Sequence, residues 1–233
     1  VLLSTVYYFA KTCIVKTIED IKRHLMLHGS FTKDIGLLDG KMGIVIFFFN
    51  YSRFTNNTLY SDFAYDLIDE IYNDLSSDYS INFDDGLCGI GWGIEYLIAN
   101  QFVNTDSSDI LEDFDDIIMQ RDIRKINDAS IETGVKGIAY YFVARYACKR
   151  QTKIPTEYLY ELIHSLTEIP DKESLSLQSW LHEIIRCQKS EIPNSSFILK
   201  FAGSIPDALL SQIPLGIRNG LAGYGLTTIN SFL

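Results

Sequence analysis

The sequence predicts an all-α fold, an α/α toroid built as an incomplete or small ring of about five helical hairpins. Three observations lead to this prediction. A glycine motif recurs at intervals that fit a period of about 46 residues. Segments that are apolar on nearly every side alternate with segments that carry one apolar stripe, as buried and surface helices do. No segment shows the sustained alternation of apolar and polar residues that a half-buried strand requires.

The glycine motif has the form Gly-x-x-Gly, and it follows an Asp, Asp, Thr or Asn. Its first glycines are Gly40, Gly86, Gly134 and Gly220. The residue types before the glycine accept hydrogen bonds at helix starts, so each motif predicts the N-terminus of a helix. Glycines at the first and fourth positions leave the backbone bare, which lets another helix or a ligand come close. A fifth, degenerate copy is expected near residue 177, where a helical pattern occurs without glycines.

Two kinds of helix are expected to alternate along the chain. Residues 43–51 and 137–148 are apolar all round and are predicted to be buried on both faces. Apolar residues spaced i, i+3, i+4 and i+7 predict one-sided helices over 60–75, 110–118 and 158–166. In a toroid the buried helices share one polarity, so their glycine-rich starts meet at one end, where a site is expected. An open solenoid of hairpins has the same periodicity and is the alternative.

Composition narrows the classes of partner and compartment. The chain has 233 residues, with 20 Lys and Arg against 30 Asp and Glu, and a net charge of −10. An acidic surface repels phosphate backbones and anionic lipids, so neither nucleic acid nor a membrane is an expected partner. The four cysteines lie far apart, which favours a reducing compartment and predicts a cytoplasmic protein. The apolar residues 1–10 are about half as many as a bilayer span needs and are predicted to belong to a first helix.

At the glycine motifs the sequence resembles the lanthionine synthetase C-like family, the cyclases of lanthipeptide maturation. That family repeats Gly-Leu-x-x-Gly-x-x-Gly-Ile at the starts of the inner helices of an α/α toroid, and residues 36–44 match the repeat position for position. Residues 86–90, 134–138 and 220–223 match its shorter core. The resemblance implies a single toroid domain over residues 1–233.

The resemblance also implies where a zinc site would lie. Family cyclases hold zinc with a Cys of a Trp-Cys repeat and with a Cys-His pair, and the zinc holds a substrate cysteine as thiolate. The corresponding residues here are Trp180-Leu181 and Arg218-Asn219. Leu, Arg and an amide do not replace these ligands. The sequence therefore predicts no metal and no cofactor. It predicts a degenerate, zinc-free pseudoenzyme or peptide-binding partner in peptide modification, with a peptide substrate or a protein of a peptide-maturation system as its partner.

Three acidic residues are candidates for catalysis. Asp39 and Asp85 occupy equivalent positions before their glycines and are candidates for an acid and base pair, with helix capping as the alternative. Glu95 is acidic within an apolar helix and either lines the cavity or pairs with a cation such as Lys41 or Arg145. The same three carboxyl groups suit a carbohydrate-active toroid, which is an alternative function beside a pure interaction scaffold.

Ligand contacts are predicted at Trp92, Trp180, His182, Arg218 and Asn219. Arg218, joined by Lys41 and Lys136, is expected to make the glycine-rich end attractive to an acidic peptide.

Two further features have a plain structural interpretation. His24 and His28 have the i, i+4 spacing of metal ligands, but no third ligand is evident and they are predicted to be surface residues. Cys88 lies in the first turn of its helix and is predicted to be a packing thiol rather than a reactive one, since no partner base is evident.

Overall fold

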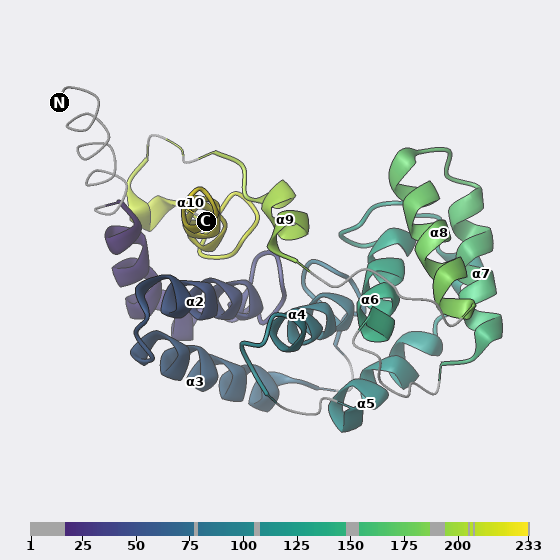
Figure 1. Cartoon of the computed structure of the whole chain (residues 1–233), viewed down its shortest axis with the longest axis horizontal. Helices are drawn as coiled ribbons and strands as arrows, with labels where there is room; N and C mark the ends of the chain where they lie inside the picture. The colour runs from purple at the N-terminus through teal and green to yellow at the C-terminus, as the bar shows by residue number, and fades with distance from the viewer. Residues whose placement is uncertain are drawn as a thin grey trace. The chain divides into compact units, whose positions relative to one another are not determined.

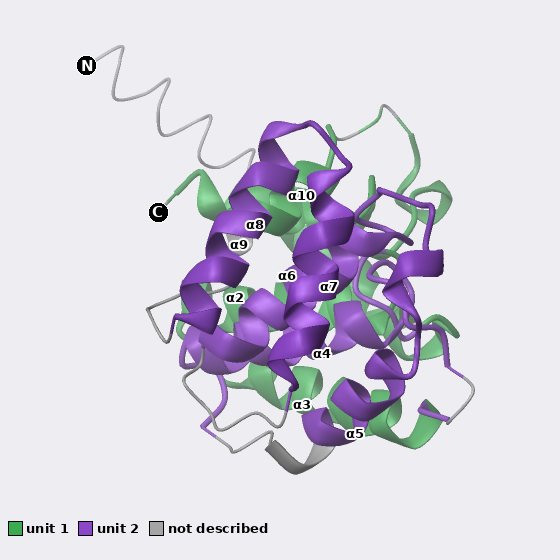
Figure 2. Ribbon diagram, turned by 90° about the vertical axis from the view of Figure 1, so that its right-hand side faces the viewer, with its two compact units in different colours: residues 1–34, 39–74, 195–233 green, residues 35–38, 75–194 purple. Residues whose placement is uncertain are grey.

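The computed structural model describes residues 17–76, 79–104, 108–147, 154–186, 194–204, 206 and 208–232. The regular structure of these residues is entirely helical. The chain divides into two compact units (Figure 2). Unit 1 comprises the described residues of 1–34, 39–74 and 195–233, and unit 2 those of 35–38 and 75–194. A single domain over the whole chain stays a prediction, and the helix predicted at the apolar start falls outside the described residues.

Unit 1 is centred on α2 (Lys41–Thr55), which packs beside α3 (Leu59–Asp74) and against α10 (Leu221–Asn230) (Figure 1). Where α10 meets α2 there is no room for a side chain, since a Cβ on Gly225 would lie 2.3 Å from the ring of Phe47. Residues 17–28 are helical as well. The short elements of this unit are η1 (Gly29–Phe31), α9 (Ser195–Ile198), η3 (Leu199–Phe201) and η4 (Leu210–Gln212).

Unit 2 contains α4, α5, the short η2, α6, α7 and α8. Their bounds are Leu87–Ala99, Ser108–Met119, Ile123–Lys125, Val135–Ala147, Thr156–Thr167 and Lys172–Ile185. Helix α4 packs against α5 and α6, α6 also contacts α7 and α8, and α7 lies beside α8 (Figure 1). No helix in the described part of the chain is long and apolar enough to cross a membrane.

The predicted alternation of enclosed and one-sided helices is confirmed. Every residue of α2 from Lys41 to Phe49 is buried, and α4, α6 and α10 are enclosed in the same way. By contrast, α3 buries only the single stripe of Ala64, Leu67 and Ile71. This pattern follows from composition, because a helix without a polar face has no side that favours water. The fold class is therefore the predicted one, all-α of the α/α toroid type.

The degenerate fifth repeat forms α8, a helix of a different character. Its start is capped by Asp171, whose carboxylate accepts the backbone N–H of Ser174 at 2.8 Å. One face, with Leu177, Leu181 and Ile184, is buried. The expected helix is present, but it is one-sided and begins with an ordinary side-chain cap rather than with glycine.

Candidate functional site

The four glycine motifs begin their helices with one shared backbone hydrogen bond. In each, the N–H of the first helical residue donates to the carbonyl oxygen seven residues earlier. The pairs are Lys41 to Asp34 at 2.9 Å, Leu87 to Ser80 at 2.8 Å, Val135 to Asp128 at 3.0 Å and Leu221 to Pro214 at 2.8 Å. Each bond closes the preceding segment into a loop over the helix start and satisfies one of the N–H groups that a helix leaves free. The four motifs are thus repeats in structure as well as in sequence.

The glycines are required because this loop lies directly on the helix. A Cβ on the fourth-position glycine would meet a carbonyl oxygen six residues earlier. It would lie 1.9 Å from Phe83 at Gly89, 2.2 Å from Ile131 at Gly137 and 2.1 Å from Ile217 at Gly223. Such distances leave no space for any side chain. The expectation that another helix or a ligand comes close to these glycines is wrong, because the chain's own preceding loop fills the space.

Helix capping, the alternative role considered for Asp39 and Asp85, is wrong. The N-cap residues of α2, α4 and α10 are Gly40, Gly86 and Gly220 themselves, and no side chain caps these helices. The loop carbonyl described above takes the place of a capping side chain, so the residue before the glycine is available for other contacts.

The two aspartates have partners within their own units. In unit 1, the guanidinium of Arg218 donates to both carboxylate oxygens of Asp39, with Nε 3.1 Å from Oδ1. Both side chains remain about one-third exposed. In unit 2, the Asp85 carboxylate accepts Nδ2 of Asn82 at 3.2 Å. Each aspartate thus ties down the loop at a helix start. The catalytic roles considered for both stay predictions.

The lysines expected to add positive charge to the glycine-rich ends are neutralised. Lys41 Nζ lies 2.9 Å from Glu70 Oε2 and 3.2 Å from Asp74 Oδ2, both on α3. Lys136 Nζ lies 2.7 Å from Asp171 Oδ2, and this contact lowers the pKa of Asp171 to about 2. Arg218, the third cation of the expected patch, is paired with Asp39. Because all three cations already have a carboxylate partner, they do not form the expected positive patch.

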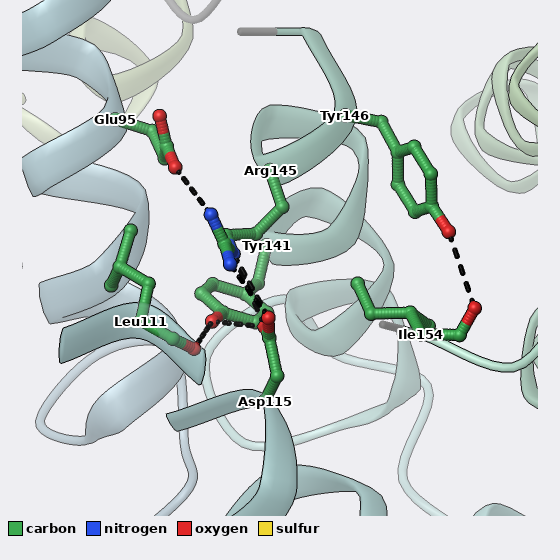
Figure 3. Close-up of polar contacts among 7 residues, drawn as sticks. All are labelled: Glu95, Leu111, Asp115, Tyr141, Arg145, Tyr146 and Ile154. Atoms are coloured by element: carbon green, nitrogen blue, oxygen red, sulfur yellow. Dashed lines mark hydrogen bonds and ion pairs between the residues drawn. The ribbon is translucent and has the colours of Figure 1, made fainter. Parts of the chain in front are cut away.

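Glu95 belongs to a buried charge network of α4, α5 and α6 (Figure 3). Its side chain is 0 % exposed, and Oε1 accepts Arg145 Nη1 at 2.9 Å. Arg145 also donates to Asp115, with Nη2 2.7 Å from Oδ2. The hydroxyl of Tyr141 donates to Asp115 Oδ1 at 2.6 Å, and burial raises the pKa of Tyr141 well above its usual value, so the hydroxyl keeps its proton. Of the two roles considered for Glu95, pairing with Arg145 is confirmed.

Trp92, expected to contact a ligand, is a core residue. Its side chain is 2 % exposed. The ring stacks on Tyr96, with centroids 5.6 Å apart, and meets Phe83 edge-on at 6.0 Å. Cys88 lies on the same helix and is fully buried, and burial raises the pKa of its thiol well above the usual value. A thiol in this state matches the predicted packing role.

The other predicted ligand contacts are more accessible. Trp180 and His182 are half-buried on α8, and the Trp180 ring lies 6.4 Å from that of Tyr140. Asn219 is exposed, adopts a left-handed φ of 49°, and its carbonyl accepts the hydroxyl of Tyr224 at 2.9 Å. These residues are open to a ligand, whereas Trp92 is not.

The histidine pair of the first helical segment is placed as predicted. The rings of His24 and His28 lie 4.4 Å apart between centroids, with His24 half-buried and His28 exposed. Burial lowers the pKa of His24.

Sequence reasoning missed a groove of about 530 Å³ in unit 2. Its walls are the loop before α4, at Ser80–Asn82, the residue Thr133 before α6, and Gln120–Asp122, Lys125 and Ile126 from the segment between α5 and α6. A smaller cavity of about 390 Å³ lies beside it and includes Asp128 and His164. The signal in the sequence was the basic run at residues 121–125, which is unusual in so acidic a chain.

These observations define an all-α repeat protein whose enclosed helices begin at glycines wrapped by a closed loop. The sequence model of the family described as lanthionine synthetase C-like protein matches residues 32–202, most of the chain. The chain therefore belongs to the lanthionine synthetase C-like family. No curated protein and no solved structure matches the sequence.

The residues predicted to stand at the family's zinc-ligand positions, Leu181, Arg218 and Asn219, do not fit a zinc ion. Leu181 offers no donor atom and is fully buried. Arg218 has no lone pair for a metal and is bound to Asp39. Arg218 and Asn219 lie beyond the matched residues, and their place in the repeat follows from the shared hydrogen bond at Leu221. Within the described ranges, no three His, Cys, Asp or Glu side chains gather as a ligand set. The absence of a metal stays a prediction.

Proposed function

We propose that this protein works in peptide modification as a zinc-free relative of the lanthionine cyclases, binding a peptide without closing its rings. What supports the proposal is the residues that the resemblance places at the family's ligand positions, which are Leu181, Arg218 and Asn219. Zinc needs thiolate, imidazole or carboxylate donors, and none of these side chains supplies one. A family fold without these donors retains the capacity to hold a peptide and loses the means to activate its cysteine.

The peptide contacts are assigned to the accessible members of the predicted set. In unit 2 these are Trp180 and His182 on α8. In unit 1 they are Arg218 and Asn219 before α10, and each pair is proposed as a contact surface of its own unit. Trp180 combines a large apolar ring with one N–H donor, a combination that suits the mixed surface of a peptide. A cytoplasmic location is part of the proposal, in line with the free thiol of Cys88.

No observation favours the carbohydrate-active alternative. A general acid or base must reach the substrate, directly or through one water molecule. Glu95 is fully enclosed and bound to Arg145, while Asp39 and Asp85 hold the loops at their helix starts.

The proposal is tested with a precursor peptide that carries cysteines and dehydrated serines. Calorimetry measures binding, and alkylation followed by mass spectrometry counts the thiols that remain free. We expect binding, with every thiol still open to alkylation whether or not Zn²⁺ is added. A family cyclase that keeps its Cys-His pair serves as the positive control for ring closure.

Two variants on α8 connect binding to the assigned surface. Trp180→Ala should weaken peptide binding, whereas Leu175→Ala, which removes a side chain that is 62 % exposed on the same helix, should not. Zinc-dependent loss of thiols would overturn the zinc-free assignment. Failure to bind any precursor peptide would overturn the peptide role and leave an interaction scaffold.

A further inference from the structure

The groove of unit 2 combines two helix-start loops with the basic segment between α5 and α6. We call it the η2 groove, defined by Ser80–Asn82, Gln120–Asp122, Lys125, Ile126 and Thr133. Its volume of about 530 Å³ is within the range of about 300–1,000 Å³ that is usual for ligand sites. That space is far larger than a single ion needs.

The charges that line the η2 groove sum to a positive value. Arg121 and Lys125 are its cations, and Asp122 is its one carboxylate. That carboxylate is already engaged, with Arg124 Nε at 2.9 Å and Lys125 Nζ at 3.4 Å. The hydrogen bond from Arg124 lowers the pKa of Asp122. An incoming anion therefore meets an occupied carboxylate and an excess of positive charge.

Arg121 differs from the other cations described above. Lys41, Lys136, Arg145 and Arg218 are each bound to at least one carboxylate. Arg121 is exposed and forms no ion pair with any residue in the described part of the chain. Its neighbour Gln120 likewise makes no side-chain hydrogen bond there. The groove thus presents a guanidinium and an amide with free donors, side by side in sequence.

We propose that the η2 groove binds an acidic stretch of the peptide that the protein handles, with Arg121 and Lys125 as cationic contacts and Gln120 as a neutral donor. The inference rests on the proposed function, and it adds where the peptide binds and that the bound stretch is acidic. Opposite charge argues for an acidic peptide, since carboxylates accept hydrogen bonds from guanidinium and ammonium groups. The net charge of −10 opposes a nucleic acid, whose phosphates extend well beyond any one groove.

The probe is a fluorescein-labelled decapeptide rich in glutamate, with a glutamine-rich counterpart as the uncharged control. Fluorescence anisotropy at low salt measures the affinity for the whole chain. Arg121→Gln should weaken binding of the glutamate peptide about fivefold, the upper range for one exposed charge pair. The matched control is Arg186→Gln, which removes an exposed arginine at the end of α8 in the same unit and should leave affinity unchanged. Circular dichroism checks that both variants fold.

Three results would overturn the inference. The first is equal weakening by Arg121→Gln and Arg186→Gln, because a general field would then explain the binding. The second is equal affinity of the wild type for the two decapeptides. The third is equal affinity of the wild type and Arg121→Gln for a precursor peptide. That result leaves the proposed function intact and removes only the proposed role of the η2 groove. If the wild type binds no precursor peptide at all, both the proposed function and the assignment of the groove are overturned.

Discussion

Arg145 compensates two buried carboxylates in unit 2 with one guanidinium. Glu95 and Asp115, on α4 and α5, both accept from it, and all three side chains are at most 5 % exposed. Burying an ion costs several kcal/mol, a cost that is offset only when the charge is paired and hydrogen-bonded. Both carboxylates therefore depend on this one side chain, which also fixes the position of α6 relative to its two neighbours.

Replacing this arginine should be severely destabilising. Arg145→Met keeps most of the side-chain volume but leaves two buried carboxylates without a cation, which should reduce the free energy of unfolding by about 3–5 kcal/mol. Urea denaturation followed by circular dichroism measures the change. Arg124→Met breaks an exposed pair with Asp122 and should leave the midpoint nearly unchanged. Similar midpoints for the two variants would contradict this account.

At the scale of the helix, the sequence was most informative where its signal was local. The glycine spacing predicted all four enclosed helix starts, because glycine marks a place where a side chain does not fit. What lies against the glycine was not predictable. The contact is made by main-chain carbonyls, and the residues that close the four loops are Asp34, Ser80, Asp128 and Pro214, which have no side-chain feature common to all four.

An added methyl group tests the tightness of these helix starts. In Gly137→Ala the new Cβ would lie 2.2 Å from the oxygen of Ile131 and 2.6 Å from Phe83 Cβ, so the backbone must shift. We expect a loss of about 1–3 kcal/mol in the free energy of unfolding, measured by denaturant titration. In Gly29→Ala the nearest atom is 3.6 Å away, an ordinary contact, and stability should change little. If both substitutions change the free energy of unfolding equally, the loop at Gly137 shifts at little cost and this account is wrong.

Across the whole molecule, charge pairing explains why the site was harder to predict than the fold. Helix periodicity lies within a few residues, whereas Arg218 and its partner Asp39 are 179 residues apart. Lys41 and Lys136 likewise find carboxylates more than 30 residues away. A sequence shows that a cation exists but not whether folding has already neutralised it. The expected anion patch therefore used residues whose charge is matched, whereas Arg121, which has no ion pair in the described part of the chain, lay in a segment that carried no motif.

Metal content provides a test at the same scale. Protein purified without added metal should contain well under one zinc ion per chain by elemental analysis, because Leu181 and Arg218 supply no ligand. A family cyclase with an intact Cys-His pair, purified in parallel, should retain its zinc. Stoichiometric zinc that survives dialysis would contradict the prediction and point to other donors, such as His182 with Cys187.

At the four helix starts of the glycine motif, a backbone hydrogen bond joins two residues that are seven positions apart, and this bond constrains how the loop between them can evolve. It joins main-chain atoms, so a substitution within the loop at a position other than glycine can preserve it, whereas one inserted or deleted residue changes the span between donor and acceptor and opens the loop. Selection therefore acts on how many residues the segment has more strongly than on which residues they are. Relatives of this protein should vary in the composition of these four stretches at positions other than the glycines and keep their length, and gaps in their alignments should fall elsewhere.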